Sequence, residues 1–116
     1  MIVGIIGSGG REHAICYKIK KSTLTTKIFC IPGNAGTSNI AENVNIKVND
    51  FKSIKNFCLN NKIELLIVGP EQPLVDGIVD YFESTNIKIF GTNKLSSKLE
   101  GSKIFTKKIC NEYNIP

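Results

Sequence analysis

The chain has 116 residues, of which 41% are hydrophobic, and it carries a formal net charge of +5 at pH 7. This length suits one small domain that buries about two thirds of the surface of the unfolded chain. No apolar run is long enough to span a membrane, and the residues after Met1 lack the basic region and cleavage site of a signal peptide. We therefore expect a cytoplasmic protein with no membrane partner.

The positive charge comes almost entirely from lysines that are scattered along the chain, and Arg11 is the only arginine. Nucleic-acid-binding modules usually gather lysine and arginine on one face and place aromatic residues between them for stacking. A solvated lysine-rich surface explains the charge better. We therefore expect no nucleic-acid partner.

The four cysteines are widely separated and lie among apolar neighbours: Cys16, Cys30, Cys58 and Cys110. None of them forms the C-x-x-C spacing that would suggest a metal site or a redox pair. We interpret them as reduced thiols of the core.

The first predicted elements are a strand over residues 2–6 and a helix over residues 11–21. The strand is rich in β-branched residues, which indicates burial on both faces of a parallel sheet. Gly7, Gly9 and Gly10 follow it, and glycines at such a turn allow positive φ angles and close approach of a ligand to the backbone. Because a helix N-terminus attracts anions, this segment predicts a phosphate-binding turn. The residues expected to face the sheet from the helix are Ala14, Ile15 and Ile19.

The turn departs from the dinucleotide-binding pattern in two ways. Glu12 stands where G-x-G-x-x-G requires its third glycine, and the next strand ends in Ile31-Pro32-Gly33 without the acidic residue that binds a ribose. We therefore keep the anion-binding interpretation and reject nicotinamide or flavin binding. The alternative is a tight turn that only packs the first helix on the sheet.

The rest of the chain alternates apolar strands with amphipathic helices. Further strands are predicted at residues 27–31, 44–48, 65–68 and 88–90. Further helices are predicted from Asp50 to Asn60, from Pro73 to Asn86, from Asn93 to Leu99 and from Ser102 to Tyr113. This alternation predicts an α/β fold, an open and mostly parallel sheet with flanking helices of the Rossmann-like type.

Loops that follow parallel strands emerge at one edge of the sheet, and ligands bind there at the point where the strand order reverses. We expect that point between the first and fourth strands. The informative loops are residues 7–12, 32–37 and 69–71. The fold therefore predicts that these three loops converge on one site.

Four segments carry a resemblance to a known family: G-S-G-G-R-E-H at 7–13, P-G-N-A-G at 32–36, G-P-E-x-P-L-V-x-G at 69–77 and E-G-S-K at 100–103. Together they resemble the phosphoribosylamine–glycine ligases, also called glycinamide ribonucleotide synthetases. The resemblance implies a substrate-binding pre-ATP-grasp domain at residues 1–100. It further implies that residues 101–116 begin a linker helix towards an ATP-grasp portion that this chain lacks.

The resemblance also implies the chemistry of the complete enzyme, in de novo purine biosynthesis. ATP and Mg²⁺ (or Mn²⁺) would activate glycine as an acyl phosphate, which the amine of phosphoribosylamine then attacks. The expected partners are therefore phosphoribosylamine, glycine and ATP. Since the catalytic and metal-binding residues would lie in the missing portion, we expect this fragment to bind no cofactor and to have no ligase turnover.

Site residues follow from matching the family motifs position by position. The predicted substrate-binding residues are Ser8, Gly9, Gly10, Arg11, Glu12, Gly33, Asn34, Ala35, Gly36 and Glu71. Glu71 is the predicted acceptor for the ribose hydroxyls, because one carboxylate can accept from both. Lys103 would approach the ATP phosphates, with a plain solvated lysine as the alternative.

The residues themselves leave simpler interpretations open for each of these positions. Arg11 and Glu12 suit an ordinary charged first turn, residues 33–36 suit a plain β-turn, and Glu71 suits a helix cap. His13 is the only histidine, and without a partner nearby in sequence it favours a structural over a catalytic role. Two other function classes also remain: a different enzyme of nucleotides or sugar phosphates, and a non-catalytic binding module.

Overall fold

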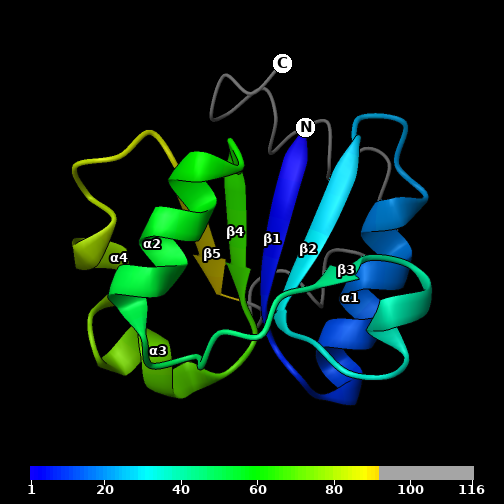
Figure 1. The fold of residues 1–116 in the computed structure, drawn as a ribbon, viewed down its shortest axis with the longest axis horizontal. Helices are drawn as coiled ribbons and strands as arrows, with labels where there is room; N and C mark the ends of the chain where they lie inside the picture. The colour runs from blue at the N-terminus through cyan, green and yellow to red at the C-terminus, as the bar shows by residue number, and fades with distance from the viewer. Residues whose placement is uncertain (92–116) are drawn as a thin grey trace.

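The computed structural model describes residues 1–91, which form a five-stranded sheet in the order β3-β2-β1-β4-β5 (Figure 1). The strands are β1 (Ile2–Gly7), β2 (Lys27–Pro32), β3 (Glu42–Asn43), β4 (Leu65–Val68) and β5 (Lys88–Gly91). All four pairings are parallel. The strand order reverses between β1 and β4, so the predicted fold class and the predicted reversal point are both confirmed.

Helices cover both faces of this sheet, with α1 on one face and α2, α3 and α4 on the other (Figure 1). Their bounds are α1 (Gly10–Lys20), α2 (Phe51–Asn60), α3 (Glu71–Val75) and α4 (Ile78–Tyr81), and a 3₁₀ turn, η1, spans Thr37–Asn39. No helix within residues 1–91 is long and apolar enough to cross a membrane. The two helices predicted after residue 92, and the domain boundary at residue 100, lie outside the described residues.

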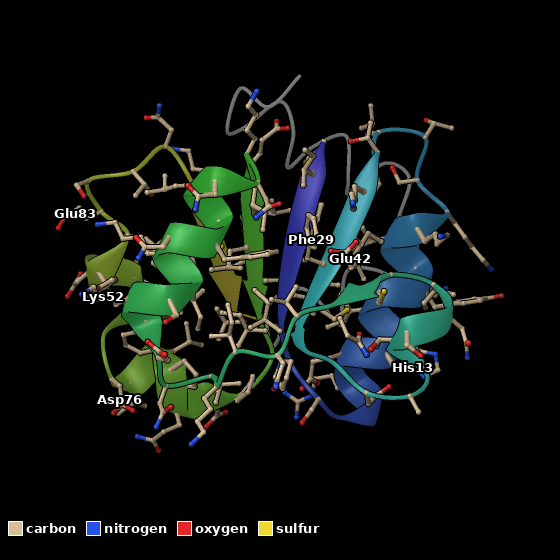
Figure 2. The ribbon with its side chains drawn as sticks, viewed as in Figure 1. His13, Phe29, Glu42, Lys52, Asp76 and Glu83 are labelled. Atoms are coloured by element: carbon tan, nitrogen blue, oxygen red, sulfur yellow. The ribbon has the colours of Figure 1, made fainter. Side chains whose placement is uncertain are left out.

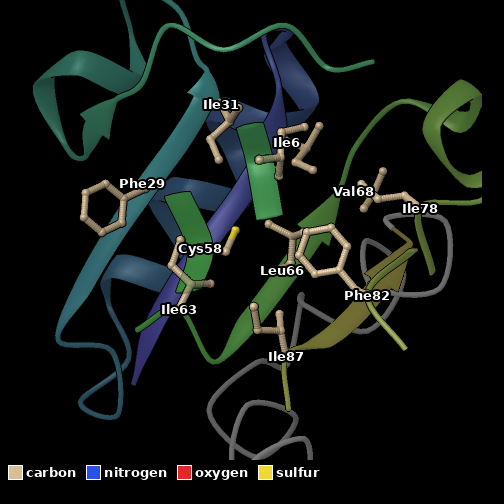
Figure 3. Packing of buried hydrophobic residues seen from close by; sticks show 11 residues of the cluster. Ile6, Phe29, Ile31, Cys58, Ile63, Leu66, Val68, Ile78, Phe82 and Ile87 are labelled. Atoms are coloured by element: carbon tan, nitrogen blue, oxygen red, sulfur yellow. The ribbon is translucent and has the colours of Figure 1, made fainter. Parts of the chain in front are cut away.

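Two apolar clusters, one on each face, hold the layers together. The pleat of β4 divides its side chains between them, because Leu65 and Ile67 join the cluster under α1 while Leu66 and Val68 join the other. Figure 3 shows the second cluster, in which Cys58 of α2 and Phe82 lie over the sheet. Burial on both faces explains why these strands are apolar throughout their length.

The third strand lies earlier in the chain than predicted. The sequence pattern predicts residues 44–48, whereas β3 covers only Glu42–Asn43 and pairs with Phe29 and Cys30 of β2. The prediction is wrong because the pairing with β2 ends early in this segment. The backbone N–H of Val44 still donates to the carbonyl oxygen of Cys30 at 2.8 Å, but that of Ile46 donates to the carbonyl oxygen of Val44. The alternating apolar residues of this segment, which contact the second cluster, are Val44, Ile46 and Val48.

The buried face of α1 also differs from the prediction at one residue. Ile15 and Ile19 are buried as expected, but Ala14 is exposed and Cys16 takes its place against the sheet. The buried stripe therefore keeps Ile15 and Ile19 but extends towards Cys16 instead of Ala14, with Glu12 as its first member. Cys16, Cys30 and Cys58 are buried, as predicted for thiols of the core, and Cys110 lies outside the described residues.

The single helix predicted after Pro73 is divided into two short helices. It begins earlier than predicted, at Glu71, and α3 ends at Val75. Gly77 then adopts a φ of +93°, in the left-handed region, before α4 begins. The apolar stripe continues across this break, which is why the sequence pattern alone resembles one helix.

Replacing Gly77 with alanine should destabilise the fold. A Cβ atom at Gly77 would meet nothing within 4 Å, so the cost would come from the left-handed backbone alone. We expect Gly77→Ala to lower the free energy of unfolding by roughly 1–2 kcal/mol, measured by urea denaturation. Val75→Ala is the matched control, because Val75 is 77% exposed and its truncation should change stability by no more than about 0.5 kcal/mol. Equal stabilities of the two variants would contradict this account.

Candidate functional site

The first loop of the candidate site links β1 to α1 at the carboxyl edge of the sheet, which lies at the bottom of Figure 1. Gly7 has a φ of +132°, as predicted for the turn. Gly9 has a φ of −94° and serves as the N-cap of α1, and Gly10 is the first helical residue. Positive φ is therefore confirmed at Gly7 and wrong at the other two glycines. Ser8, Gly9, Gly10 and Arg11 are all exposed.

Glu12 lies inside this loop rather than on its surface, with only 7% of its area exposed. Its Oε1 accepts a hydrogen bond of 3.4 Å from the backbone N–H of Gly9. A Cβ atom at Gly69 would lie 2.5 Å from the Glu12 carboxyl carbon, and a Cβ atom at Gly7 would overlap Oε1. The Glu12 side chain therefore fills the space between the ends of β1 and β4. Its predicted contact with substrate stays a prediction.

The second loop follows β2 and is bonded directly to the first. Asn34 Nδ2 donates to the carbonyl oxygen of Ser8 at 2.9 Å and to that of Gly9 at 3.3 Å. Asn34 Oδ1 accepts from the backbone N–H of Thr37 at 2.9 Å. Both ends of this amide are thus engaged within the protein. The structure brings the two predicted loops together, through a side chain that the sequence assigned to substrate contact.

Thr37 and Asn43 were not predicted, although they hold the second loop in shape. Thr37 is fully buried, and its hydroxyl accepts from the backbone N–H of Asn34 at 2.8 Å and donates to Asn43 Oδ1 at 2.7 Å. Asn43 Nδ2 in turn donates to the carbonyl oxygen of Asn34 at 2.8 Å. The reciprocal bonds between Asn34 and Thr37 resemble a capping box, so the spacing N-x-x-T is the signal that could have revealed Thr37. Asn43 lies too far along the chain for a local signal.

His13 lies next to the second loop, where Figure 2 shows it beside the segment that contains η1. A Cβ atom at Gly36 would lie 2.6 Å from His13 Cε1. The imidazole therefore packs against the Gly36 backbone, which supports a structural role for His13. Gly36 must lack a side chain for α1 and this loop to approach so closely.

The third loop follows β4 and lies beside the first. The backbone N–H of Gly69 donates to the carbonyl oxygen of Ile6 at 2.9 Å, which extends the pairing of the two strands to their ends. Pro70 is the N-cap of α3, and Glu71 is its first residue, with an exposed side chain. Glu71 therefore lies at the carboxyl edge next to the reversal point. Lys103, the predicted ATP contact, lies outside the described residues.

The groups that the carboxyl edge of the sheet offers to a ligand are mainly backbone groups of its loops. The first turn of α1 directs its amide groups out of the helix end, and the helix dipole adds partial positive charge there. Such a terminus favours an anionic group such as a phosphate. Within residues 1–91, no group of three or more His, Cys, Asp and Glu side chains is arranged to hold a metal ion.

Comparison with known proteins places this geometry in a family. Residues 1–100 match the family described as "Phosphoribosylglycinamide synthetase, N domain". The chain belongs to this family. The match includes the three loops of the candidate site and extends past β5.

Curated members of this synthetase family are similar in sequence to this chain along its whole length. Phosphoribosylamine–glycine ligase of Caldanaerobacter subterraneus subsp. tengcongensis is 53% identical over 116 residues, and that of Mesorhizobium japonicum is 49% identical. All of this chain is covered in both, but only 28% and 27% of the two relatives. The chain thus spans little more than a quarter of the length of these synthetases.

A solved structure of the synthetase family has the same fold. The crystal structure of phosphoribosylamine–glycine ligase from Thermotoga maritima matches with a TM-score of 0.50 and 29% identity, over 98% of this chain and 25% of that one. The likeness supports the five-stranded parallel sheet as the fold of the synthetase N domain.

Asn34→Ala should loosen the junction of the two loops. The substitution removes the amide that bonds Ser8, Gly9 and Thr37, so we expect a loss of about 1–3 kcal/mol in the free energy of unfolding. Amide hydrogen exchange at residues 33–37 should also become faster. Asn39→Ala is the control, since the Asn39 side chain is exposed and donates only at 3.5 Å to the carbonyl oxygen of Ala35. Unchanged exchange in Asn34→Ala would contradict the assigned role.

Proposed function

We propose that this chain is the N-terminal substrate domain of a phosphoribosylamine–glycine ligase and that it provides the phosphoribosylamine site. The observation that carries the proposal is that Asn34 bonds the loop after β2 directly to the loop after β1, which borders the reversal point between β1 and β4. Open parallel sheets bind ligands at that point. The family match and the ligase relatives supply the identity of the ligand.

In this proposal the loop from Ser8 to Arg11 receives the 5-phosphate. The backbone of this loop leads into the first turn of an eleven-residue helix, whose dipole favours a dianion. A Cβ atom at Gly10 would meet nothing within 4 Å, so the space beside that residue is open on the protein side. The phosphate would fill this space. Residues 33–36, in the loop after β2, would contribute backbone groups from the other side of the contact between the two loops.

Glu71 would accept hydrogen bonds from the ribose hydroxyls. Its position at the start of α3 places a carboxylate on the loop adjacent to the first, two residues after Gly69. The helix dipole of α3 provides a competing explanation for an acidic residue at this position. These two roles predict different effects of the same substitution.

The remaining substrates would be bound by the portion of the ligase that this chain does not include. We assign ATP, glycine and Mg²⁺ or Mn²⁺ to an ATP-grasp portion of a cytoplasmic purine-biosynthetic enzyme, because the chain spans only 28% of its relatives. Lys103 is the one residue of this chain that we propose to approach the ATP phosphates. The isolated chain should accordingly release no ADP in a coupled assay.

Calorimetry on the isolated chain tests the phosphate loop. A stable phosphoribosyl amine analogue should bind, and NAD should not. Gly10→Val should weaken binding by about tenfold or more, because the branched side chain would occupy the open space beside Gly10. Its melting temperature should change little, which separates lost binding from lost folding. Tight binding of NAD, or equal affinity of the analogue for both chains, would refute the assignment.

Glu71→Ala tests the ribose contact in the full-length ligase. A hydrogen bond to a charged group contributes about 1.5–3 kcal/mol, so the KM for phosphoribosylamine should rise roughly ten- to a hundredfold. The KM values for glycine and ATP should barely move. Glu83→Ala is the matched control, since Glu83 is an exposed acid that Figure 2 shows far from Asp76 and the carboxyl edge. An unchanged phosphoribosylamine KM with a lowered melting temperature would favour the helix-dipole role.

A further inference from the structure

Two of the buried cysteines lie against each other beneath the candidate site. Cys16 is on α1 and Cys30 is on β2, fourteen residues apart in sequence. Their Sγ atoms are 3.9 Å apart, and the Cys30 thiol donates a hydrogen bond to Cys16 Sγ. Both side chains have no exposed area. The sequence spacing gives no hint of this pair, because a helix face and a strand must pack before the sulfurs meet.

From this contact we propose that Cys16 and Cys30 are a redox-modification site, at which the two thiols form a reversible intramolecular disulfide. A disulfide bond is about 2.05 Å long, so the sulfurs must approach by a little under 2 Å. Small rotations of the two side chains, or a slight shift of α1 towards β2, can provide that approach.

The two thiols differ in the way that a nucleophile and its resolving partner differ. The hydrogen bond from Cys30 lowers the pKa of Cys16, against the opposing effect of burial, and the nearby Lys20 ammonium lowers it further. Donating to Cys16, together with burial, raises the pKa of Cys30. Cys16 is therefore the thiol that attacks the oxidant, since the thiolate is the reactive form.

Hydrogen peroxide is a suitable oxidant because it is small and uncharged and can reach a buried pair during local opening. Cys16 sulfur attacks one peroxide oxygen, the O–O bond breaks, and water leaves after protonation, which makes Cys16 a sulfenic acid. Cys30 sulfur then attacks Cys16 sulfur, the S–S bond forms, the S–O bond breaks, and a second water leaves. Overall, two thiols lose two electrons and two protons to one peroxide.

The position of the pair gives the modification a structural consequence. Cys16 lies one helical turn after Glu12 on the buried face of α1, and Cys30 contacts the Thr37 hydroxyl that shapes the second loop. A disulfide would join α1 covalently to β2 directly beneath the junction of the two loops. Cys58 provides the internal comparison, since burial raises its pKa to about 12 but it lies in the cluster on the opposite face of the sheet.

Peptide mapping of the oxidised chain tests the proposal. The folded wild-type chain and a Cys58→Ser/Cys110→Ser variant would be treated with hydrogen peroxide, blocked with an alkylating agent and digested with trypsin without reduction. Cleavage after lysine and arginine places Cys16 in peptide 12–18, Cys30 in peptide 28–47 and Cys58 in peptide 56–62. We expect peptides 12–18 and 28–47 to be joined, and dithiothreitol to separate them.

The cross-link should exceed that of every other cysteine pair by about tenfold or more in the folded chain. In guanidinium chloride this preference should disappear, because the contact between α1 and β2 is lost. Circular dichroism of the variant would establish that it is folded. A folded chain that yields no joined peptides, or that joins Cys58 or Cys110 as readily as Cys30 to Cys16, would overturn the proposal.

Discussion

The space between the ends of β1 and β4 is filled by one side chain, and the geometry of the site depends on it. Glu12 reaches back from the first turn of α1 into this space, where Gly7 and Gly69 lack the side chains that would exclude it. In a dinucleotide-binding turn, a glycine on the helix permits close packing of helix and strand. Here the space is provided by Gly7 at the end of β1 and Gly69 just after β4, and the helix carries the larger residue. The departure from G-x-G-x-x-G is therefore a different solution to the same packing problem.

Much of the fold could be predicted from the sequence because the strands are buried on both faces. Continuous apolar runs such as Leu65 to Val68 occur only where helices cover both sides of a sheet, so composition and topology agree. The prediction of secondary structure was wrong where the apolar pattern of the sequence continues but the backbone hydrogen bonding of the strand or helix does not. Val44, Ile46 and Val48 alternate like a strand and contact the core, but the bonding to β2 ends with the hydrogen bond from the Val44 N–H to the Cys30 carbonyl oxygen. Gly77 likewise interrupts a helix whose apolar stripe continues past it.

The candidate site could be predicted as a set of loops but not as a set of side-chain roles. Glycine and proline fix where the chain turns, and parallel topology fixes which turns meet. The function of Asn34 depends on the carbonyl groups of Ser8 and Gly9, more than twenty residues away in the chain, so no local pattern specifies it. The same holds for the contact of His13 with Gly36. Burial of Glu12 depends on Gly7, five residues before it, and also on Gly69 of the third loop, which no local pattern links to it.

These contacts divide the motif residues into two groups with different physical tasks. The side chains of Glu12 and Asn34 bond to backbone groups of the first loop, so they set its shape while its exposed backbone faces outward. A loop held in this way loses little conformational entropy when a ligand binds, which raises affinity without any added contact. The identity of a motif residue can therefore matter for binding even where its side chain never reaches the ligand. The Cys16–Cys30 contact lies under the same junction, so a covalent change there would act on the loops through α1 and β2 rather than by obstructing the site.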